Sequence, residues 1–183
     1  MVAGVSFETS SGLTGLTNAS GEFYYQIGDM VSFCPWDVEL GSVAASLVLT
    51  PDEMVGAVST ADRKVINLSR FLQTLDDDAD PTNGLSVNES ARTAISGRSL
   101  NFNLTVSIFE ITASAAVQAT SGQTLVDASN AINHLHGTLV EHGIVQFAQE
   151  NDIQQVVATF VADSTLTEAF SSNSSYAESI ITS

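Results

Sequence analysis

One stretch of the chain, residues 67–84, constrains the fold more than any other. It reads NLSRFLQTLDDDADPTNG and joins an amphipathic pattern to a dense run of aspartates. Four of the five residues at positions 76–80 are Asp, and Pro81 and Gly84 prevent a helix from continuing. Apolar residues recur before this point at helical spacing, at Val65, Ile66, Leu68, Phe71, Leu72 and Leu75. The stretch therefore predicts a partly buried helix that ends in a sharply turning acidic loop.

Two signatures of helix starts bracket this loop. Residues 59–62 read Ser-x-x-Asp, and residues 86–89 read Ser-x-x-Glu, both forms of the capping box. The second helix is expected to end near Ser96, because Gly97 follows it. Together the two signatures predict a helix–loop–helix around the acidic loop.

The residues before this unit have the composition of strands. Over residues 1–50, short runs rich in β-branched and aromatic residues alternate with Gly, Asn, Ser and Asp, and residues 42–50 are expected to form one further strand. This spacing predicts an antiparallel sheet or half-sandwich. Later in the chain, residues 101–108 (NFNLTVSI) alternate strictly between apolar and polar, which indicates a half-buried strand or an extended connector.

The remaining pattern is helical until the tail. Residues 111–119 are expected to be weakly helical, and further helices are expected from Asp127 or Ser129 to about His142 and over residues 146–161. We therefore expect an α+β fold: an N-terminal antiparallel β unit followed by a helical unit. Its expected parts are a β-rich unit at 1–58, a helical unit at 59–161 and a Ser/Thr-rich, repeat-like tail at 162–183.

The charge is strongly one-sided, with 21 Asp and Glu against five Lys and Arg and a formal net charge of −16. Nucleic-acid binding relies on Lys and Arg to neutralise phosphates, so a nucleic-acid partner is not expected. No apolar run is long enough to cross a bilayer, so no transmembrane segment is expected. The basic residues all lie between positions 63 and 98. They are expected to pair with Asp76–Asp80 and with helix C-termini, and the alternative is an anchor for an acidic partner.

Cys34, the single cysteine, excludes an internal disulfide and is expected to be a small buried hydrophobe. A signal peptide is not expected, because the first residues lead directly into strand-like sequence.

The acidic loop is the best candidate for a metal site. Carboxylates on alternate residues of a tight loop can converge on a hard cation such as Ca²⁺, which takes six to eight oxygen ligands. A complete EF-hand is not expected, because Pro81 stands where that loop carries Gly and Val87 occupies its twelfth position. The alternative is a solvated acidic turn that caps helices. The candidate ligands are Asp76, Asp78, Asp80, Asn83 and Glu89.

Other side chains offer less specific chemistry. The three histidines, at 134, 136 and 142, lack the i, i+4 pairing of a zinc helix and are expected to be structural. No nucleophile elbow or glycine-rich phosphate loop occurs, so an enzyme is not expected. Aromatic residues near the N-terminus could form a stacking platform for a glycan or contact another partner: Tyr24, Tyr25, Phe33 and Trp36.

The pattern NLxRFLQTLDxDxDPxNG carries a resemblance. Preceded by GLTGLTNASGEFYYQIGD and VELGSV, and followed by LVDASNAINHLHGTL, it resembles an extracellular module of bacterial lipoproteins and secreted multidomain proteins over about residues 2–140. Related sequences usually have Gly where this chain has Ala79. The resemblance implies location and architecture, not a reaction. The tail, with related units at 162–172 and 173–183, resembles Ser/Thr/Ala repeats of phage tail and fibre proteins.

These observations lead to two expectations of function. The first is a non-enzymatic structural, adhesive or assembly module, displayed outside the cell, at its surface or on a virion, with its acidic loop stabilised by Ca²⁺. Its partner would be a protein or glycan surface, or further copies of itself. The second is a carbohydrate-binding accessory domain of a secreted hydrolase.

Overall fold

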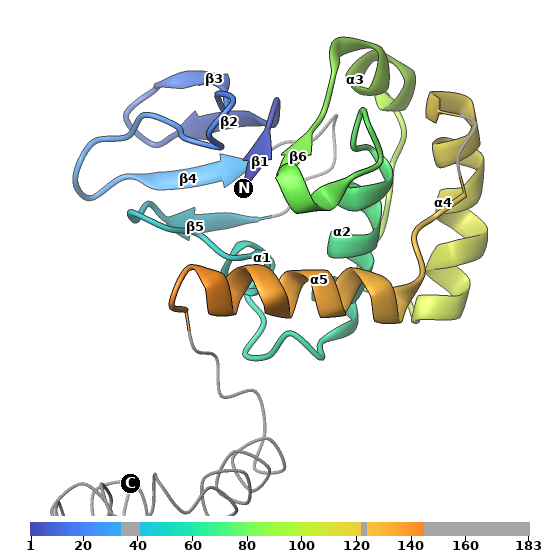
Figure 1. The fold of residues 1–183 in the computed structure, drawn as a ribbon. Helices are drawn as coiled ribbons and strands as arrows, with labels where there is room; N and C mark the ends of the chain where they lie inside the picture. Colours follow the sequence, from blue (N-terminus) through green and yellow to red (C-terminus); the bar gives the residue numbers. More distant parts are fainter. Residues whose placement is uncertain (34–40, 122–123, 145–183) are drawn as a thin grey trace, which may run out of the picture. The chain divides into compact units, whose positions relative to one another are not determined.

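A small antiparallel sheet and a group of helices share one hydrophobic core in the computed structural model (Figure 1). The structure describes residues 1–33, 41–121 and 124–144. Their strands are β1 (Val2–Ala3), β2 (Ser6–Thr9), β3 (Thr14–Leu16), β4 (Met30–Phe33), β5 (Ser42–Ala44) and β6 (Leu85–Ser86). Their helices are α1 (Pro51–Met54), α2 (Arg63–Thr74), the 3₁₀ turn η1 (Pro81–Asn83), α3 (Glu89–Ile95), α4 (Val106–Ser121) and α5 (Ala128–Glu141). The predicted α+β class, with strands mostly before helices, is confirmed.

The main sheet has the strand order β3-β2-β4-β5 and is antiparallel throughout. Phe7 lies directly opposite Phe33, and both side chains are buried on the face that turns toward the helices. Phe23 packs between them, with ring centroids 5.5 Å from Phe7 and 5.3 Å from Phe33. This aromatic cluster joins the sheet to the core, because cross-strand aromatic pairs stabilise a sheet as well as bury surface.

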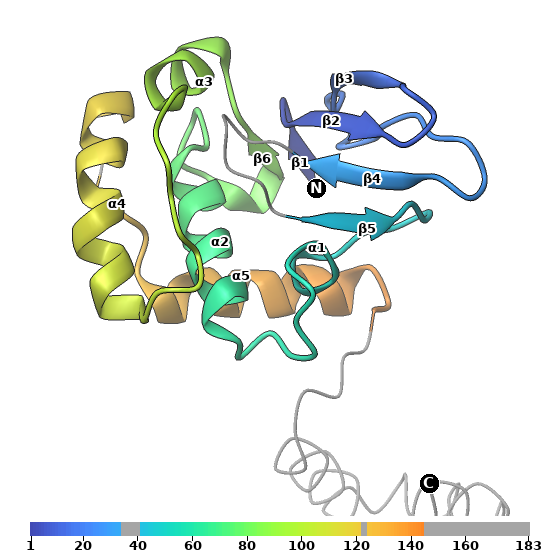
Figure 2. The ribbon, with the colours of Figure 1, turned by 180° about the vertical axis from the view of Figure 1, so that it is seen from behind.

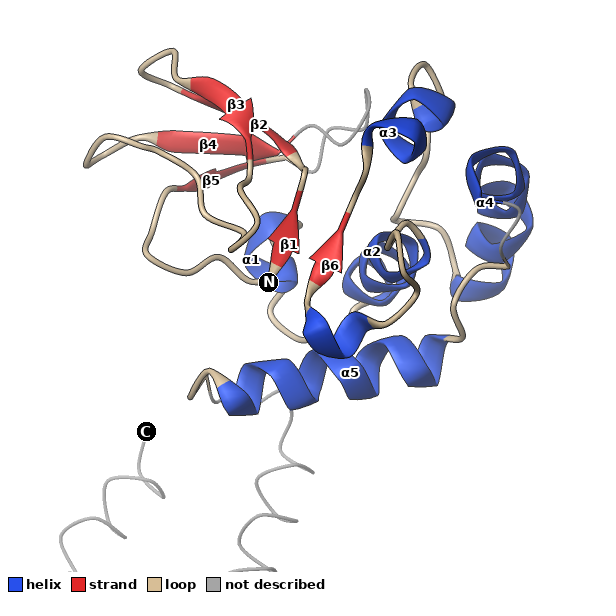
Figure 3. Ribbon diagram, turned by 45° about the horizontal axis from the view of Figure 1, so that its top comes forward, coloured by secondary structure: helices blue, strands red, loops and turns tan. Residues whose placement is uncertain are grey.

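A second pairing ties the start of the chain to the end of the acidic loop. β1 pairs in parallel with β6, with Val2 opposite Leu85 and Ala3 opposite Ser86 (Figure 3). The sequence indicated only antiparallel pairing. This parallel pair was not predicted, because it joins residues that are more than 80 positions apart in the chain. Phe7 and Phe33 consequently share a core with Leu68 and Phe71 of the helical part.

Helix α2 is the centre of the helical part and lies against α1, α4 and α5 (Figures 1 and 2). The predicted amphipathic stripe is confirmed: Val65, Leu68 and Phe71 are fully buried. Polar side chains of α2 are buried as well. Asn67, with 0% of its surface exposed, donates through Nδ2 to the carbonyl oxygens of Phe102 and Leu104.

Both helices begin later than predicted, α2 by three residues and α3 by two. The N-cap of α2 is Asp62, whose carboxylate accepts from the backbone N–H of Lys64, and that of α3 is Asn88. Ser59 instead closes a local turn by accepting from the backbone N–H of residue 61, and Ser86 belongs to β6. The predicted capping boxes at 59–62 and 86–89 are therefore wrong, because turn and strand contacts occupy their serines.

The predicted strand or extended connector at 101–108 is also wrong. Residues 101–104 form a turn, and α4 begins at Val106. Phe102 is buried against Phe71 and Phe109, with ring centroids at 5.8 and 5.3 Å, so its burial comes from helix packing. Ile108, expected on the buried face, is 49% exposed. The strand predicted over 42–50 is limited to Ser42–Ala44.

The helix predicted from Asp127 is confirmed. Its N-cap carboxylate accepts from the backbone N–H groups of Ser129 and Asn130, and the helix ends before His142. The helix predicted over 146–161, the tail at 162–183, Cys34 and Trp36 lie outside the described residues.

Candidate metal centre

The acidic loop is closed by its first two aspartates. Oδ1 of Asp76 accepts a 2.8 Å hydrogen bond from the backbone N–H of Ser86. Asp77 donates its backbone N–H to the carbonyl oxygen of Ser86 at 2.9 Å, and its Oδ2 accepts from the Ser86 hydroxyl at 3.2 Å. These contacts place the residues after α2 beside β6.

The rest of the loop is held by short-range contacts of Asp78 and Asp80. Oδ1 of Asp78 accepts from the backbone N–H of Asp80 at 2.9 Å, and its Oδ2 accepts from Nδ2 of Asn83 at 2.7 Å. Oδ1 of Asp80 accepts from the backbone N–H and hydroxyl of Thr82. Ala79, between them, has a φ of 57°, a left-handed conformation that favours glycine.

Three consecutive carboxylates converge in this loop. Each of Asp76, Asp77 and Asp78 places one oxygen so that the three atoms lie within 4.8 Å of one another. Asp76 is 3% exposed, and its Oδ2 is buried without a hydrogen-bond partner. Burial raises the pKa of Asp76, and the neighbouring negative charges of Asp78 and Asp77 raise it further, while the Ser86 N–H opposes them. A buried carboxylate oxygen with no protein donor, beside two further carboxylates, is suited to a cation.

The carboxylate of Asp78 differs from that of Asp76. The Asn83 amide, followed by the Asp80 N–H, lowers the pKa of Asp78, so this side chain is negatively charged at neutral pH. The cluster therefore combines Asp78, whose negative charge is stabilised by hydrogen bonds, with Asp76, whose negative charge is unfavourable without a counter-ion.

The predicted ligand set is brought together only in part. Asp76 and Asp78 belong to the cluster, and Asp77, which the alternate-residue spacing left out, belongs to it as well. Asp80 instead caps η1, and Asn83 donates to Asp78 through its amide nitrogen. Glu89 lies in the first turn of α3 and is not among the clustered carboxylates. A tight turn can point consecutive side chains inward, which spacing rules for regular elements do not anticipate.

The basic residues do not pair with the acidic loop within the described part of the chain. Arg70 forms an ion pair with Glu110 at 3.2 Å, and its Nε donates to the carbonyl oxygen of Val126 at 2.6 Å. Arg63 donates to Asn103. The expected pairing with Asp76–Asp80 is therefore wrong, because these side chains are bound to Glu110 of α4 and to the segments that precede α4 and α5. Arg98 does donate to a carbonyl in the last turn of α3, as expected.

Among the histidines, His136 contacts Thr60 through Nε2 at 2.7 Å, and the carbonyl oxygen of His134 accepts from the Thr138 hydroxyl. Burial lowers the pKa of His134. His142 caps the C-terminus of α5. The first contact joins α5 to the turn before α2, and the second lies within α5.

Three of the four residues of the expected aromatic platform lie in the described part of the chain. Tyr24 is 81% exposed, while Tyr25 packs against Phe23 with ring centroids at 5.6 Å. Phe33 is buried in the sheet, and it lines the same cavity as Tyr24 and Tyr25. Trp36 lies outside the described residues.

No protein-family model, curated protein or solved structure matches this chain. Within residues 1–33, 41–121 and 124–144, the helices are too short or too polar to cross a membrane.

Proposed function

We propose that this chain is a non-enzymatic structural or adhesive module that acts outside the cell, with the loop of Asp76, Asp77 and Asp78 binding Ca²⁺. One observation supports the cation above all others: Oδ2 of Asp76 is buried without a hydrogen-bond partner, beside two further carboxylates. Leaving such an oxygen charged is costly unless a cation balances it.

Ca²⁺ suits this loop better than Mg²⁺. The three carboxylates lie on an irregular turn, and Ca²⁺ accepts irregular coordination with water completing its shell, whereas Mg²⁺ demands a near-ideal octahedron. The abundance of acidic residues and the module resemblance support an extracellular setting, where Ca²⁺ is plentiful. Binding would hold the end of α2 against β6 and thereby stabilise the β1–β6 pair.

A Ca²⁺ titration of the full chain tests this proposal. Extracellular modules bind Ca²⁺ with dissociation constants of about 0.1–1 mM. At 10 mM Ca²⁺ such a site stabilises the fold by about 2 kcal/mol, which raises the melting temperature by roughly 4–8 °C. Asp76→Asn should abolish the shift, while Glu141→Gln, which removes one exposed charge from α5, should retain it. Equal melting temperatures in Ca²⁺ and EDTA for the unmodified chain would contradict the cation.

The assembly role has a separate test. Analytical ultracentrifugation of the chain with and without Ca²⁺ measures whether it associates with itself. Self-association would favour an assembly module, and a monomer in both conditions would leave adhesion to another surface as the proposed role.

A further inference from the structure

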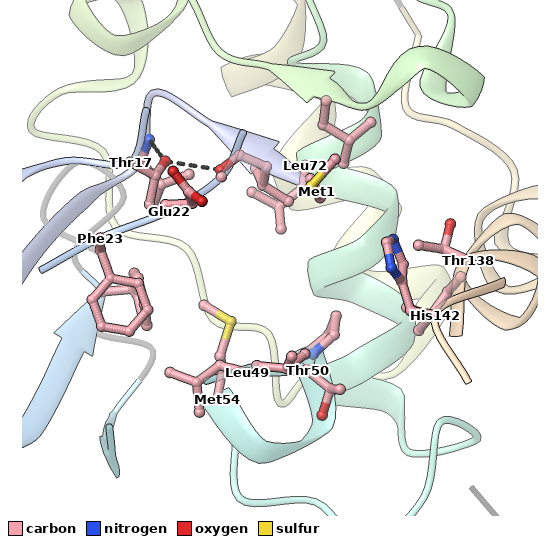
Figure 4. Close-up of a pocket in the computed structure, with 18 of the residues that line it drawn as sticks. Met1, Thr17, Glu22, Phe23, Leu49, Thr50, Met54, Leu72, Thr138 and His142 are labelled. Atoms are coloured by element: carbon pink, nitrogen blue, oxygen red, sulfur yellow. Dashed lines mark hydrogen bonds between the residues drawn. The ribbon is translucent and has the colours of Figure 1, made fainter. Parts of the chain in front are cut away.

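A cavity of about 680 Å³ lies between the sheet, α1, α2 and α5. Its walls come from distant parts of the chain: the residues before β4 with Phe33, the segment leading into and including α1, the second half of α2, Leu85 of β6, and the second half of α5 with the residues that follow it. Figure 4 shows Phe23 on one side facing His142 and Thr138 on the other, with Met54 and Leu72 between them. Its volume falls within the range of small-molecule sites.

The walls are mainly apolar. The aromatic side of the cavity carries Phe23, and the helices contribute apolar side chains. At the rim, Leu47 is 95% exposed and Val48 56% exposed, in the segment between β5 and α1. Exposed aliphatic side chains beside an apolar cavity are typical of a surface that a ligand covers.

Polar side chains occur on several walls of the cavity, and α5 contributes a hydroxyl and two imidazoles. Those on the other walls include Thr17, Glu22, Thr50 and Gln73. Thr138, His134 and His142 line the cavity from α5. Burial lowers the pKa of His134, so its imidazole is neutral at pH 7.5 and can accept or donate a hydrogen bond. This wall therefore offers hydrogen bonds to a polar group of a ligand.

The charges around the cavity disfavour an anion. Among the described residues that line it, none is Lys or Arg, and Glu22 contributes a carboxylate. Met1 also lines the cavity, and after burial the positive charge of its α-ammonium group is the second cause that lowers the pKa of His134. The whole chain carries a net charge of −16. A carboxylate or phosphate headgroup would therefore be desolvated without a Lys or Arg partner.

We infer that this cavity binds an uncharged amphiphile, a molecule with a hydrocarbon body and a single hydroxyl or carbonyl group that faces the polar wall of α5. The apolar body would lie between Phe23, Met54 and Leu72, and would cover Leu47 at the rim. The inference concerns a site separate from the acidic loop and does not depend on the proposed function.

Fluorescence of the neutral probe N-phenyl-1-naphthylamine tests the site on the full chain. The probe should bind saturably, and 1-decanol should displace it at least about tenfold more effectively than decanoate at pH 7.5. Both competitors have ten carbon atoms, but the first ends in a neutral hydroxyl and the second in a charged carboxylate. Absence of saturable binding, or equal displacement by the two competitors, would overturn the inference. Displacement by an oligosaccharide and not by decanol would overturn it too.

A matched pair of tryptophan variants tests whether the probe binds in this cavity. Thr138→Trp puts a large side chain on the polar wall and should weaken probe binding at least about tenfold. Ile111→Trp adds the same side chain at a position on α4 that is 75% exposed and does not line the cavity, and it should leave binding unchanged. Thermal denaturation by circular dichroism confirms that each variant is folded. Unchanged binding in a folded Thr138→Trp protein would place the probe elsewhere and overturn the assignment. If Thr138→Trp does not fold, His142→Trp at the exposed end of the same wall replaces it, with the same expected loss.

Discussion

The carboxylate of Asp76 accepts a 2.8 Å hydrogen bond from the backbone N–H of Ser86, ten residues further along the chain. This contact returns the chain from the end of α2 to β6, where it pairs with β1. The other oxygen of the same carboxylate is buried without a partner. One side chain therefore closes the loop and also leaves a buried oxygen without a partner beside two further carboxylates.

The raised pKa of Asp76 predicts that the stability of the fold depends on pH. The folded-state pKa of Asp76 is raised above its ordinary value of 3.8, so its favourable contribution is fully present below 3.8 and is lost as the pH rises through the folded-state value. In EDTA, the melting temperature of the unmodified chain should therefore fall relative to that of Asp76→Asn between pH 4 and pH 7, by roughly 2–4 °C. In 10 mM Ca²⁺ at pH 7 the unmodified chain should instead have a higher melting temperature than Asp76→Asn. Circular dichroism melts measure both, and a difference that does not vary with pH in EDTA would contradict the prediction.

The left-handed backbone at Ala79 predicts a stabilising substitution. Its φ of 57° costs an L-residue about 1 kcal/mol, which glycine avoids. Ala79→Gly should therefore raise the free energy of unfolding by about 0.5 kcal/mol, once the greater freedom of glycine in the unfolded chain is subtracted. Ala94→Gly, inside α3, should lower it by about 1 kcal/mol. Urea denaturation measures both changes, and a loss of stability in Ala79→Gly would argue against strain at this position.

Asp29 should be important for the sheet. Its carboxylate accepts four hydrogen bonds, from the backbone N–H and hydroxyl of Ser11, the hydroxyl of Ser10 and the backbone N–H of Gln26. The Gln26 N–H is the main cause that lowers the pKa of Asp29. Asp29→Asn replaces one acceptor oxygen by a donor, so it should lower the melting temperature by roughly 4 °C or more at pH 7.

The pH dependence separates this effect from a change in packing. A lowered folded-state pKa gives stability that is present above the ordinary value of 3.8 and lost as the pH falls through the folded-state value. The difference between Asp29→Asn and the unmodified chain should therefore shrink below pH 3.8. A difference that persists unchanged at pH 2.5 would assign it to packing alone.

Arg70 and Glu110 should contribute unequally, although they form one ion pair. The Arg70 side chain is 3% exposed and also donates to the Val126 carbonyl, whereas the Glu110 side chain is 59% exposed. Arg70→Ala should therefore cost about 2–4 kcal/mol, through lost packing and an unpaired carbonyl. Glu110→Ala should cost less than about 1 kcal/mol, as exposed partners usually do. Equal losses in urea denaturation would show that the ion pair itself is the main contribution.

The elements that the sequence predicted correctly are those with long, regular patterns. The stripe from Val65 to Leu75 specified α2, and Asp127 with Gly143 marked the ends of α5, because helical spacing and capping are local properties. The alternation over 101–108 wrongly predicted a strand, because Phe102 is buried by Phe71 and Phe109 and not by a neighbouring strand. Alternation alone cannot supply the partner strand that a strand requires.

The candidate site divides in the same way. The density of aspartates at 76–80 located the acidic loop. The sequence could not show which carboxylates form the cluster, because this depends on how Asp76 and Asp77 contact Ser86. The cavity was missed for a similar reason: its walls come from segments between Met1 and Ile144 with no shared pattern.

The sequence by itself determined the α+β class, the buried face of α2, the extent of α5 and the position of the acidic loop, since each depends on neighbouring residues. The tertiary structure decided the parallel pairing of β1 with β6, the convergence of Asp76, Asp77 and Asp78, and the partner of Arg70. These relationships join residues that are distant in sequence or lie in an irregular turn. They depend on which surfaces pack together, and burial of the whole core, including Phe7 and Phe71, selects that packing.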